Sequence, residues 1–461
     1  MIAASTSNLL AAREQMAFTL AFHIPFACMG IAFPLMVLIA NWLGVRGDGD
    51  ALTLAQRWSK VMAVTFAVGA VTGTVLSFEL GLLWPGMMAR YGDVFGIPFG
   101  IEGIFFFTEA IFIAIYIYGW KRLPPKLHLL TAVPIVIAGI GGAFAVVAAN
   151  SWMNQPGGFT ENASGKVTSV NTFDVLFNKA TPYEVPHMLL AAYIVAGFLV
   201  ASVYAVGWLR GRRDRLHRLG FTIPFAVAAV ATPIQLFVGD TAARAIAKDQ
   251  PIKFAAIEYV QTTSRNVPEW IYGIYNGGNP KYGISIPGFD SFLVGWSTST
   301  EVTGLDSVPP DDRPPANTML HWAFDTMVGI CTALIALGAW FGFVWWRRRD
   351  IPQTKWFLRA CAVSGVAAVV ALECGWIVTE VGRQPWVVYE IMRTEDAVTG
   401  ASGVWVTFSL VLALYAVLGT VLVITLRTMA ARWREAPAED QPVPYGPQRP
   451  PVEEVGSGGA G

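Results

Sequence analysis

Runs of apolar residues, each about 20 residues or longer, recur along the chain and are separated by more polar connections. A helix of about 20 residues crosses the roughly 30 Å hydrocarbon core of a bilayer, so each run predicts a transmembrane helix. The pattern therefore predicts an all-α, polytopic membrane protein with about nine transmembrane helices, within a domain that covers residues 1–432. The predicted spans cover residues 15–42, 57–82, 97–119, 128–149, 183–208, 218–238, 318–345, 356–379 and 403–428.

Three polar segments do not fit this pattern. Residues 150–182 contain the string NSWMNQPGGF and predict a polar, glycine-rich loop. Residues 239–317 mix aromatic residues, prolines and charges, which predicts a folded cap on the same surface as that loop. Residues 433–461 are rich in Pro, Gly and acidic residues and poor in apolar side chains, so they predict a disordered tail.

Composition supports the membrane interpretation, because 54% of the residues are hydrophobic and only 14% are charged. Such a chain has too little polar surface to cover a soluble domain of 461 residues. The first apolar run is also too long for a cleavable signal peptide and lacks a basic region before it. We find no internal repeat, which argues against a transporter built from inverted halves.

Basic residues are concentrated in alternate connections, although the formal net charge is zero. The positive-inside rule places these connections in the cytoplasm, which puts the amino terminus outside and the tail inside. Because a membrane span lies on both sides of each basic run, we interpret the runs as topology signals and not as a nucleic-acid surface. The basic residues are Lys121, Arg122, Lys126, Arg210, Arg212, Arg213, Arg215, Arg218, Arg347, Arg348, Arg349 and Lys355.

All four cysteines lie inside apolar spans without CxxC spacing. They are therefore expected to be small core residues, and neither disulfides nor an iron–sulfur site is predicted.

Several ionisable side chains lie inside the predicted spans, where each costs roughly 2.5–3.5 kcal/mol on insertion scales and needs a partner or a function. Of the five histidines, only His23, His187 and His321 lie at membrane depth or at its outer edge. If iron is bound, its ligands must therefore include a thioether or a carboxylate besides imidazole. The ionisable residues in question are His23, Glu79, Glu102, Glu109, His187, Asp325, Glu373 and Glu380.

Glu102 and Glu109 are seven residues apart, which brings them to one helix face. At 1.5 Å per residue they are separated by about 10 Å along the axis. Two carboxylates at different depths could move a proton stepwise from the cytoplasmic half of the membrane. The alternative is that one of them is a neutral, hydrogen-bonded core residue.

Five strings resemble the large subunit of the cytochrome bd quinol oxidases, and the resemblance extends from about residue 10 to 430. The most specific is GWIVTEVGRQPW at 375–386. The others are FH at 22–23, IEGIFFFTEAIF at 101–112, NSWMNQP at 150–156 and KFAAIE at 253–258.

The resemblance implies three hemes, two of type b and one of type d. His187 and Met327 match the axial pair of the low-spin heme b, in which two neutral ligands leave no position for O2. His23 and Glu380 match the ligands of the two high-spin hemes, and which residue binds which heme stays open. Arg383 is expected to pair with heme propionates or with Glu380.

The resemblance also implies a terminal oxidase that oxidises ubiquinol or menaquinol at the outer face and reduces O2 to water, with cytoplasmic protons and without pumping. Glu102 and Glu109 match residues linked to heme d and its proton supply. Lys253 and Glu258 match quinol-binding positions in a short outer loop at 239–317. A smaller subunit II, with or without a further single-span subunit, is expected in the bacterial cytoplasmic membrane.

One position departs from the family pattern. Many members carry arginine two positions before the methionine ligand, whereas this chain has Asp325 in the string FDTMVG. Loss of a cation should lower the potential of the nearby heme unless Asp325 is protonated or paired. The alternatives are a heme-b-only or electron-transfer cytochrome of the same fold and, from another class, a proton-coupled transporter.

Overall fold

The computed structural model describes residues 2–163, 165–274, 280–315 and 318–435. Within these residues, nine helices are long and apolar enough to cross a membrane. They are α1 (Ile2–Val45), α2 (Gly49–Leu83), α3 (Pro85–Gly119), α4 (Pro125–Asn154), α6 (Thr181–Leu209), α7 (Arg215–Asp249), α10 (Thr318–Arg348), α11 (Lys355–Gly382) and α13 (Val404–Glu435). The predicted spans are confirmed, although the helices extend beyond most of them.

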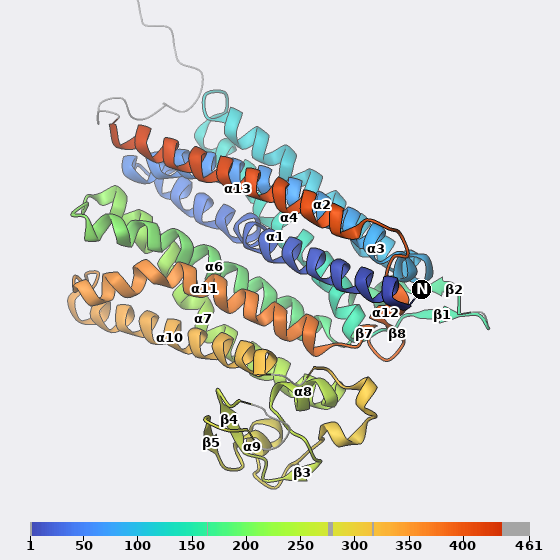
Figure 1. Cartoon of the computed structure of the whole chain (residues 1–461). Coiled ribbons are helices and arrows are strands. Elements are labelled where there is room, and N and C mark those ends of the chain that lie inside the picture. The colour runs from blue at the N-terminus through green and yellow to red at the C-terminus, as the bar shows by residue number, and fades with distance from the viewer. Residues whose placement is uncertain (1, 164, 275–279, 316–317, 436–461) are drawn as a thin grey trace, which may run out of the picture.

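The long helices lie side by side in one bundle (Figure 1). α1 packs on α2, α4, α6 and α13, while α6, α7, α10 and α11 pack on one another as a second group. About half of the most apolar stretch of α1 and of α6 is buried, against about a tenth in α10 and α13. The centre of the bundle is therefore formed by α1 and α6, and the apolar outer faces of the other helices are those expected against lipid or a partner.

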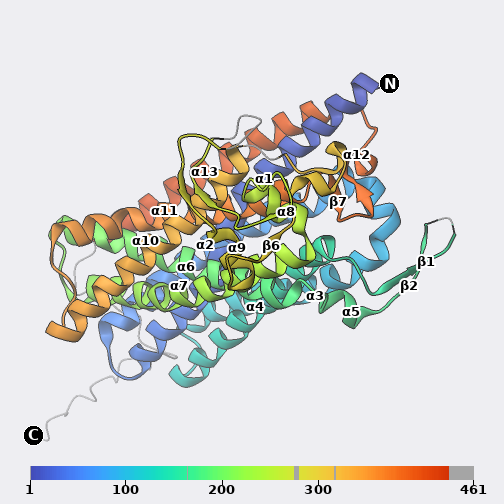
Figure 2. The same ribbon diagram turned by 90° about the horizontal axis from the view of Figure 1, so that it is seen from below.

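Short elements fill the connections at the end of the bundle where α1 begins (Figures 1 and 2). They form four antiparallel two-stranded sheets, which pair β1 with β2, β3 with β6, β4 with β5, and β7 with β8. The strands are β1 (Phe159–Glu161), β2 (Val167–Val170), β3 (Ser264–Arg265), β4 (Glu269–Ile271), β5 (Ile284–Ile286), β6 (Glu301–Val302), β7 (Trp386–Val388) and β8 (Met392–Arg393). The short helices are α5 (Thr172–Leu176), α8 (Pro251–Ile257), α9 (Phe289–Gly295), η1 (Leu305–Ser307), η2 (Pro310–Asp312) and α12 (Thr394–Ala397).

Two helices run on into segments that the sequence assigned to loops. α4 ends at Asn154, so the first residues of NSWMNQP are helical. α7 continues to Asp249, well into the segment predicted as a cap, and is supported there by an Arg244–Asp240 ion pair at 2.9 Å. Hydropathy cannot identify a polar helix that continues beyond an apolar run. We call residues 250–317 the α7–α10 loop.

The basic connections gather at the opposite end of the bundle. Arg215 pairs with Asp48 at 2.5 Å, and Arg218 pairs with Asp350 at 3.0 Å, which joins three of the connections at that end. α13 also ends there, and most of the tail predicted to be disordered, from residue 436 onward, lies outside the described residues.

Candidate functional site

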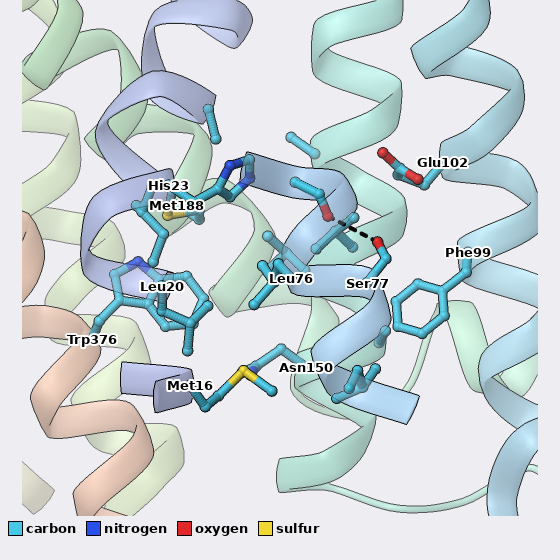
Figure 3. Close-up of a pocket in the computed structure, with 18 of the residues that line it drawn as sticks. Met16, Leu20, His23, Leu76, Ser77, Phe99, Glu102, Asn150, Met188 and Trp376 are labelled. Atoms are coloured by element: carbon cyan, nitrogen blue, oxygen red, sulfur yellow. Dashed lines mark hydrogen bonds between the residues drawn. The ribbon is translucent and has the colours of Figure 1, made fainter. Parts of the chain in front are cut away.

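A cavity of about 670 Å³ lies among α1, α2, α3, α4 and α11. It is lined by five of the residues selected from the sequence, His23, Glu102, Glu109, Glu380 and Arg383. Figure 3 shows the imidazole of His23 extending from α1, Glu102 on α3 across the cavity, and Trp376 reaching in from α11. The remaining lining is largely apolar, and the volume falls within the range of cofactor pockets.

His23 is held by Thr72 of α2, and His23 Nδ1 lies 2.9 Å from Thr72 Oγ1. Thr72 Oγ1 is also within hydrogen-bond distance of the carbonyl oxygens of Val68 and Gly69, at 3.0 and 3.1 Å. When the hydroxyl donates its single proton to the backbone, it accepts from His23 Nδ1–H, and this tautomer leaves the Nε2 lone pair free for a metal ion. Gly73 lets the ring lie close to α2, because a Cβ there would be 3.1 Å from His23 Cε1.

Glu380 is fixed by hydrogen bonds to both carboxylate oxygens. Asn150 Nδ2 donates to Oε1 at 2.8 Å, and Arg383 Nη2 donates to Oε2 at 2.6 Å. Arg383 is only 2% exposed, and its Nε and Nη1 have no hydrogen-bond partner among the described residues. These buried N–H groups, at the cavity wall, are suitable donors for an anionic group such as a heme propionate.

His187 and Met327 lie in the second helix group and do not line this cavity. His187 is in the first turns of α6 and Met327 in the early turns of α10, next to glycines of the neighbouring helices. A Cβ on Gly239 of α7 would be 3.5 Å from His187 Cε1, and one on Gly375 of α11 would be 3.1 Å from Met327 Sδ. The buried Nδ1 of His187 has no partner among the described residues. Small neighbours and an imidazole without a protein partner fit a second cofactor position.

The membrane carboxylates differ in their surroundings. Glu109 is 8% exposed, lines the cavity, and its Oε1 has no partner among the described residues. Glu79, by contrast, accepts from Gln15 Nε2 at 2.8 Å and from Thr19 Oγ1 at 3.0 Å, away from the cavity. Both bonds of Glu79 end on Oε1, and its buried Oε2 has no partner among the described residues. Glu79 differs from Glu102 and Glu109 in that it does not line the cavity.

Lys253 and Glu258 do not share surroundings. Lys253 is 2% exposed, its Nζ donates to the carbonyl oxygen of Thr379 at 3.4 Å, and burial lowers its pKa to about 8. It lines a smaller cavity of about 220 Å³ together with Arg383. Glu258 instead lies near Glu269, in the interior of the α7–α10 loop. α8 thus presents the two groups to different sites.

Asp325 is paired. Its Oδ2 accepts from the backbone N–H of Tyr272 at 2.5 Å and lies 3.3 Å from His321 Nε2. A paired Asp325 need not lower the potential of the nearby heme. The value of that potential stays a prediction.

Four residues of the site were not selected from the sequence. Thr72 resembles any other threonine inside a span. The sequence places Asn150 in a loop, and Trp376 differs from most other tryptophans only in lying within GWIVTEVGRQPW. Glu184 is hydrogen bonded by Ser151 at 2.8 Å and by Asn154 Nδ2 at 3.0 Å. The NSWMNQP string is the available signal, because its polar residues donate hydrogen bonds to Glu184 and Glu380.

The donor set fits hemes. Imidazole, thioether and carboxylate groups are known axial ligands or neighbours of porphyrin iron, and apolar walls with buried cationic donors suit the macrocycle and its propionates.

Comparisons with known proteins agree with this geometry. A family model described as cytochrome bd terminal oxidase subunit I matches residues 11–433. The chain is 33% identical over 429 residues to a putative cytochrome bd menaquinol oxidase subunit I of Bacillus subtilis (strain 168), covering 91% of this chain and 96% of that protein. It is 32% identical over 438 residues to a cytochrome bd ubiquinol oxidase subunit 1 of the same strain, covering 90% and 92%. The structure of the bd oxidase from Geobacillus thermodenitrificans aligns with a TM-score of 0.86 at 34% identity, covering 92% of this chain and 98% of that one.

Proposed function

Because the chain belongs to the cytochrome bd terminal oxidase subunit I family, we propose that His187 and Met327 bind a low-spin heme b and that His23 and Glu380 each bind a high-spin heme. Family membership makes the chain one subunit of a respiratory membrane enzyme, a quinol:oxygen oxidoreductase. When bound, the hemes supply electron transfer and an open iron position for O2.

The observation that carries this proposal is the cavity that both His23 and Glu380 line. Thr72 leaves His23 Nε2 free as a ligand, and Arg383 with Asn150 keeps Glu380 oriented as a carboxylate. Each residue would supply one donor atom to a heme iron, and the heme, when bound, would supply the site at which O2 is reduced. One of these hemes is of type d in the reading we favour, and a heme-b-only enzyme is the alternative.

Protons for water formation reach the cavity through Glu109 and Glu102. Reduction of one O2 to two water molecules consumes four protons and four electrons, and two quinols supply the electrons. Glu109 lies deeper along α3 than Glu102 by about 10 Å, in the direction of the basic end of the bundle. With the basic end of the bundle in the cytoplasm, protons for water formation are taken up from the cytoplasm. Quinol oxidation releases protons on the other side of the membrane. Charge is thereby separated across the membrane without a proton pump.

Lys253 is the residue best placed to donate a hydrogen bond to a quinol oxygen, from the small cavity that it shares with Arg383. Glu258, at the other end of α8, does not line this cavity and lies instead beside Glu269 in the α7–α10 loop. The quinol is ubiquinol or menaquinol. We place the enzyme in the bacterial cytoplasmic membrane, in complex with a smaller subunit II and with or without a further single-span subunit.

The test is a reduced-minus-oxidised spectrum of the purified complex, together with quinol-dependent O2 uptake. A far-red band indicates heme d, whereas heme b bands alone indicate the alternative. His187→Ala should remove the low-spin signal, and His23→Ala should remove a high-spin signal. A complex without any heme absorption would refute the proposal and favour a proton-coupled transporter.

A further inference from the structure

Three acidic side chains from separate elements meet inside the α7–α10 loop. Glu258 follows α8, Glu269 begins β4, and Asp290 lies in the first turn of α9. One carboxylate oxygen from each lies within 4.8 Å of the other two. Their exposed fractions are 3%, 9% and 0%, so the cluster is enclosed by protein.

Few donors reach these carboxylates, and the hydrogen bond between Asp290 and Glu269 joins two acidic groups of the cluster itself. Apart from that contact, both oxygens of Asp290, Oε2 of Glu258 and Oε2 of Glu269 are buried without a partner among the described residues. A buried acceptor that is left unsatisfied costs about 1–3 kcal/mol, and more when it is charged. Three such groups in contact therefore need a bound cation or shared protons to be stable.

Among the described residues, the charged groups that act on this cluster are all acidic. Glu269 and Asp325 act on Glu258, and Glu258, Glu269 and Asp325 act on Asp290. Burial, followed by these neighbours, raises the pKa of both Glu258 and Asp290 well above the usual value. Asp325 has partners of its own in Tyr272 and His321 and does not satisfy the cluster. The cluster requires either a metal cation or shared protons.

We propose that Glu258, Glu269 and Asp290 bind one Ca²⁺ ion that holds α8, β4 and α9 together. A set of oxygen donors without histidine or cysteine selects hard divalent cations over Zn²⁺ or Cu²⁺. Ca²⁺–oxygen distances of about 2.3–2.6 Å place opposite ligands about 4.6–5.2 Å apart. One Ca²⁺ can therefore contact all three carboxylates at their observed separation, with water completing its coordination.

Equilibrium dialysis of the purified full complex tests this directly, at free Ca²⁺ from about 1 µM to 1 mM. We expect about one saturable Ca²⁺ per chain that Asp290→Asn removes, with at least about a tenfold loss of affinity. Asp311→Asn is the matched control, because Asp311 is an exposed carboxylate of the same loop. It should bind Ca²⁺ as the wild type does.

A second measurement covers the case in which Asp290→Asn does not assemble. In the wild-type complex, chelation by EDTA should speed proteolytic cleavage of the α7–α10 loop, and added Ca²⁺ should restore resistance. Absence of saturable binding by the wild type, equal binding by Asp290→Asn, or cleavage unaffected by EDTA would each overturn the site and leave shared protons as the explanation. Heme content and O2 uptake are read separately, so failure of the Ca²⁺ site is distinguishable from failure of the proposed oxidase chemistry.

Discussion

Replacing Thr72 with valine should weaken the binding of heme at His23 while leaving the helix intact. Valine has nearly the same shape as threonine but cannot accept the proton of His23 Nδ1. Thr72 is 0% exposed, so water cannot easily take the place of the hydroxyl. The imidazole is then left with an unsatisfied N–H or in the wrong tautomer.

The size of the effect follows from that contact. An unsatisfied buried donor costs about 1–3 kcal/mol. Loss of a group that orients a metal ligand typically costs 10- to 100-fold in affinity, which is about 1.4–2.8 kcal/mol. The two estimates agree, so we expect the high-spin signal that depends on His23 to fall by at least about tenfold when heme is limiting.

The assay is the heme-to-protein ratio of the purified complex, together with a CO-difference spectrum of the high-spin iron. Thr65→Val is the matched control, because Thr65 lies on the same helix and bonds only backbone carbonyls, at 3.0 and 3.1 Å. Thr72→Ser keeps the hydroxyl and should retain most of the signal. Wild-type heme content and an unchanged spectrum in Thr72→Val would refute the assigned tautomer.

Three further predictions concern protons, charge and pH. Glu109→Gln should slow O2 reduction by at least about tenfold with normal heme content. Glu79→Gln should not, because Glu79 does not line the cavity. Full turnover and full proton uptake in Glu109→Gln would exclude this route. Arg383→Gln leaves Glu380 without its cation and should deplete one high-spin signal. Arg383→Lys should partly restore that signal, and equal spectra in the two variants would count against the ion pair. Lys253 has a pKa of about 8, so its ammonium form is present below that pH and lost above it. The KM for quinol should therefore rise as the pH increases through about 8. Lys253→Arg stays charged and should abolish that rise.

The sequence predicted the spans well because a membrane imposes one strong requirement, about 20 apolar residues for each crossing. The same requirement made His23 and Glu109 conspicuous, since ionisable groups are costly there. Thr72 was not detectable in this way, because a threonine inside a span carries no charge and its importance depends on which helix faces it. The sequence places Asn150 in a loop because the apolar run ends at residue 149, whereas the helix continues through polar residues to Asn154.

Contacts in the α7–α10 loop could not be predicted for a different reason. Glu258 and Asp290 are 32 residues apart in the chain, and only the folding of short strands and helices between them brings them together. Secondary-structure propensity is a local property, so it cannot predict this long-range contact between two side chains. Lys253 and Glu258, although only five residues apart, were expected to act on one substrate, and the structure turns them to different neighbours.

Hydrogen bonds join the α7–α10 loop to the residues next to two candidate iron ligands. Lys253 bonds the carbonyl of Thr379, which precedes Glu380, and Tyr272 bonds Asp325, two residues before Met327. A disturbance of this loop by an antibody, an inhibitor or proteolytic cleavage would therefore act within one turn of helix of both candidate ligands. If these residues bind heme as proposed, the optical spectrum of the complex should change when the loop is occupied or cut.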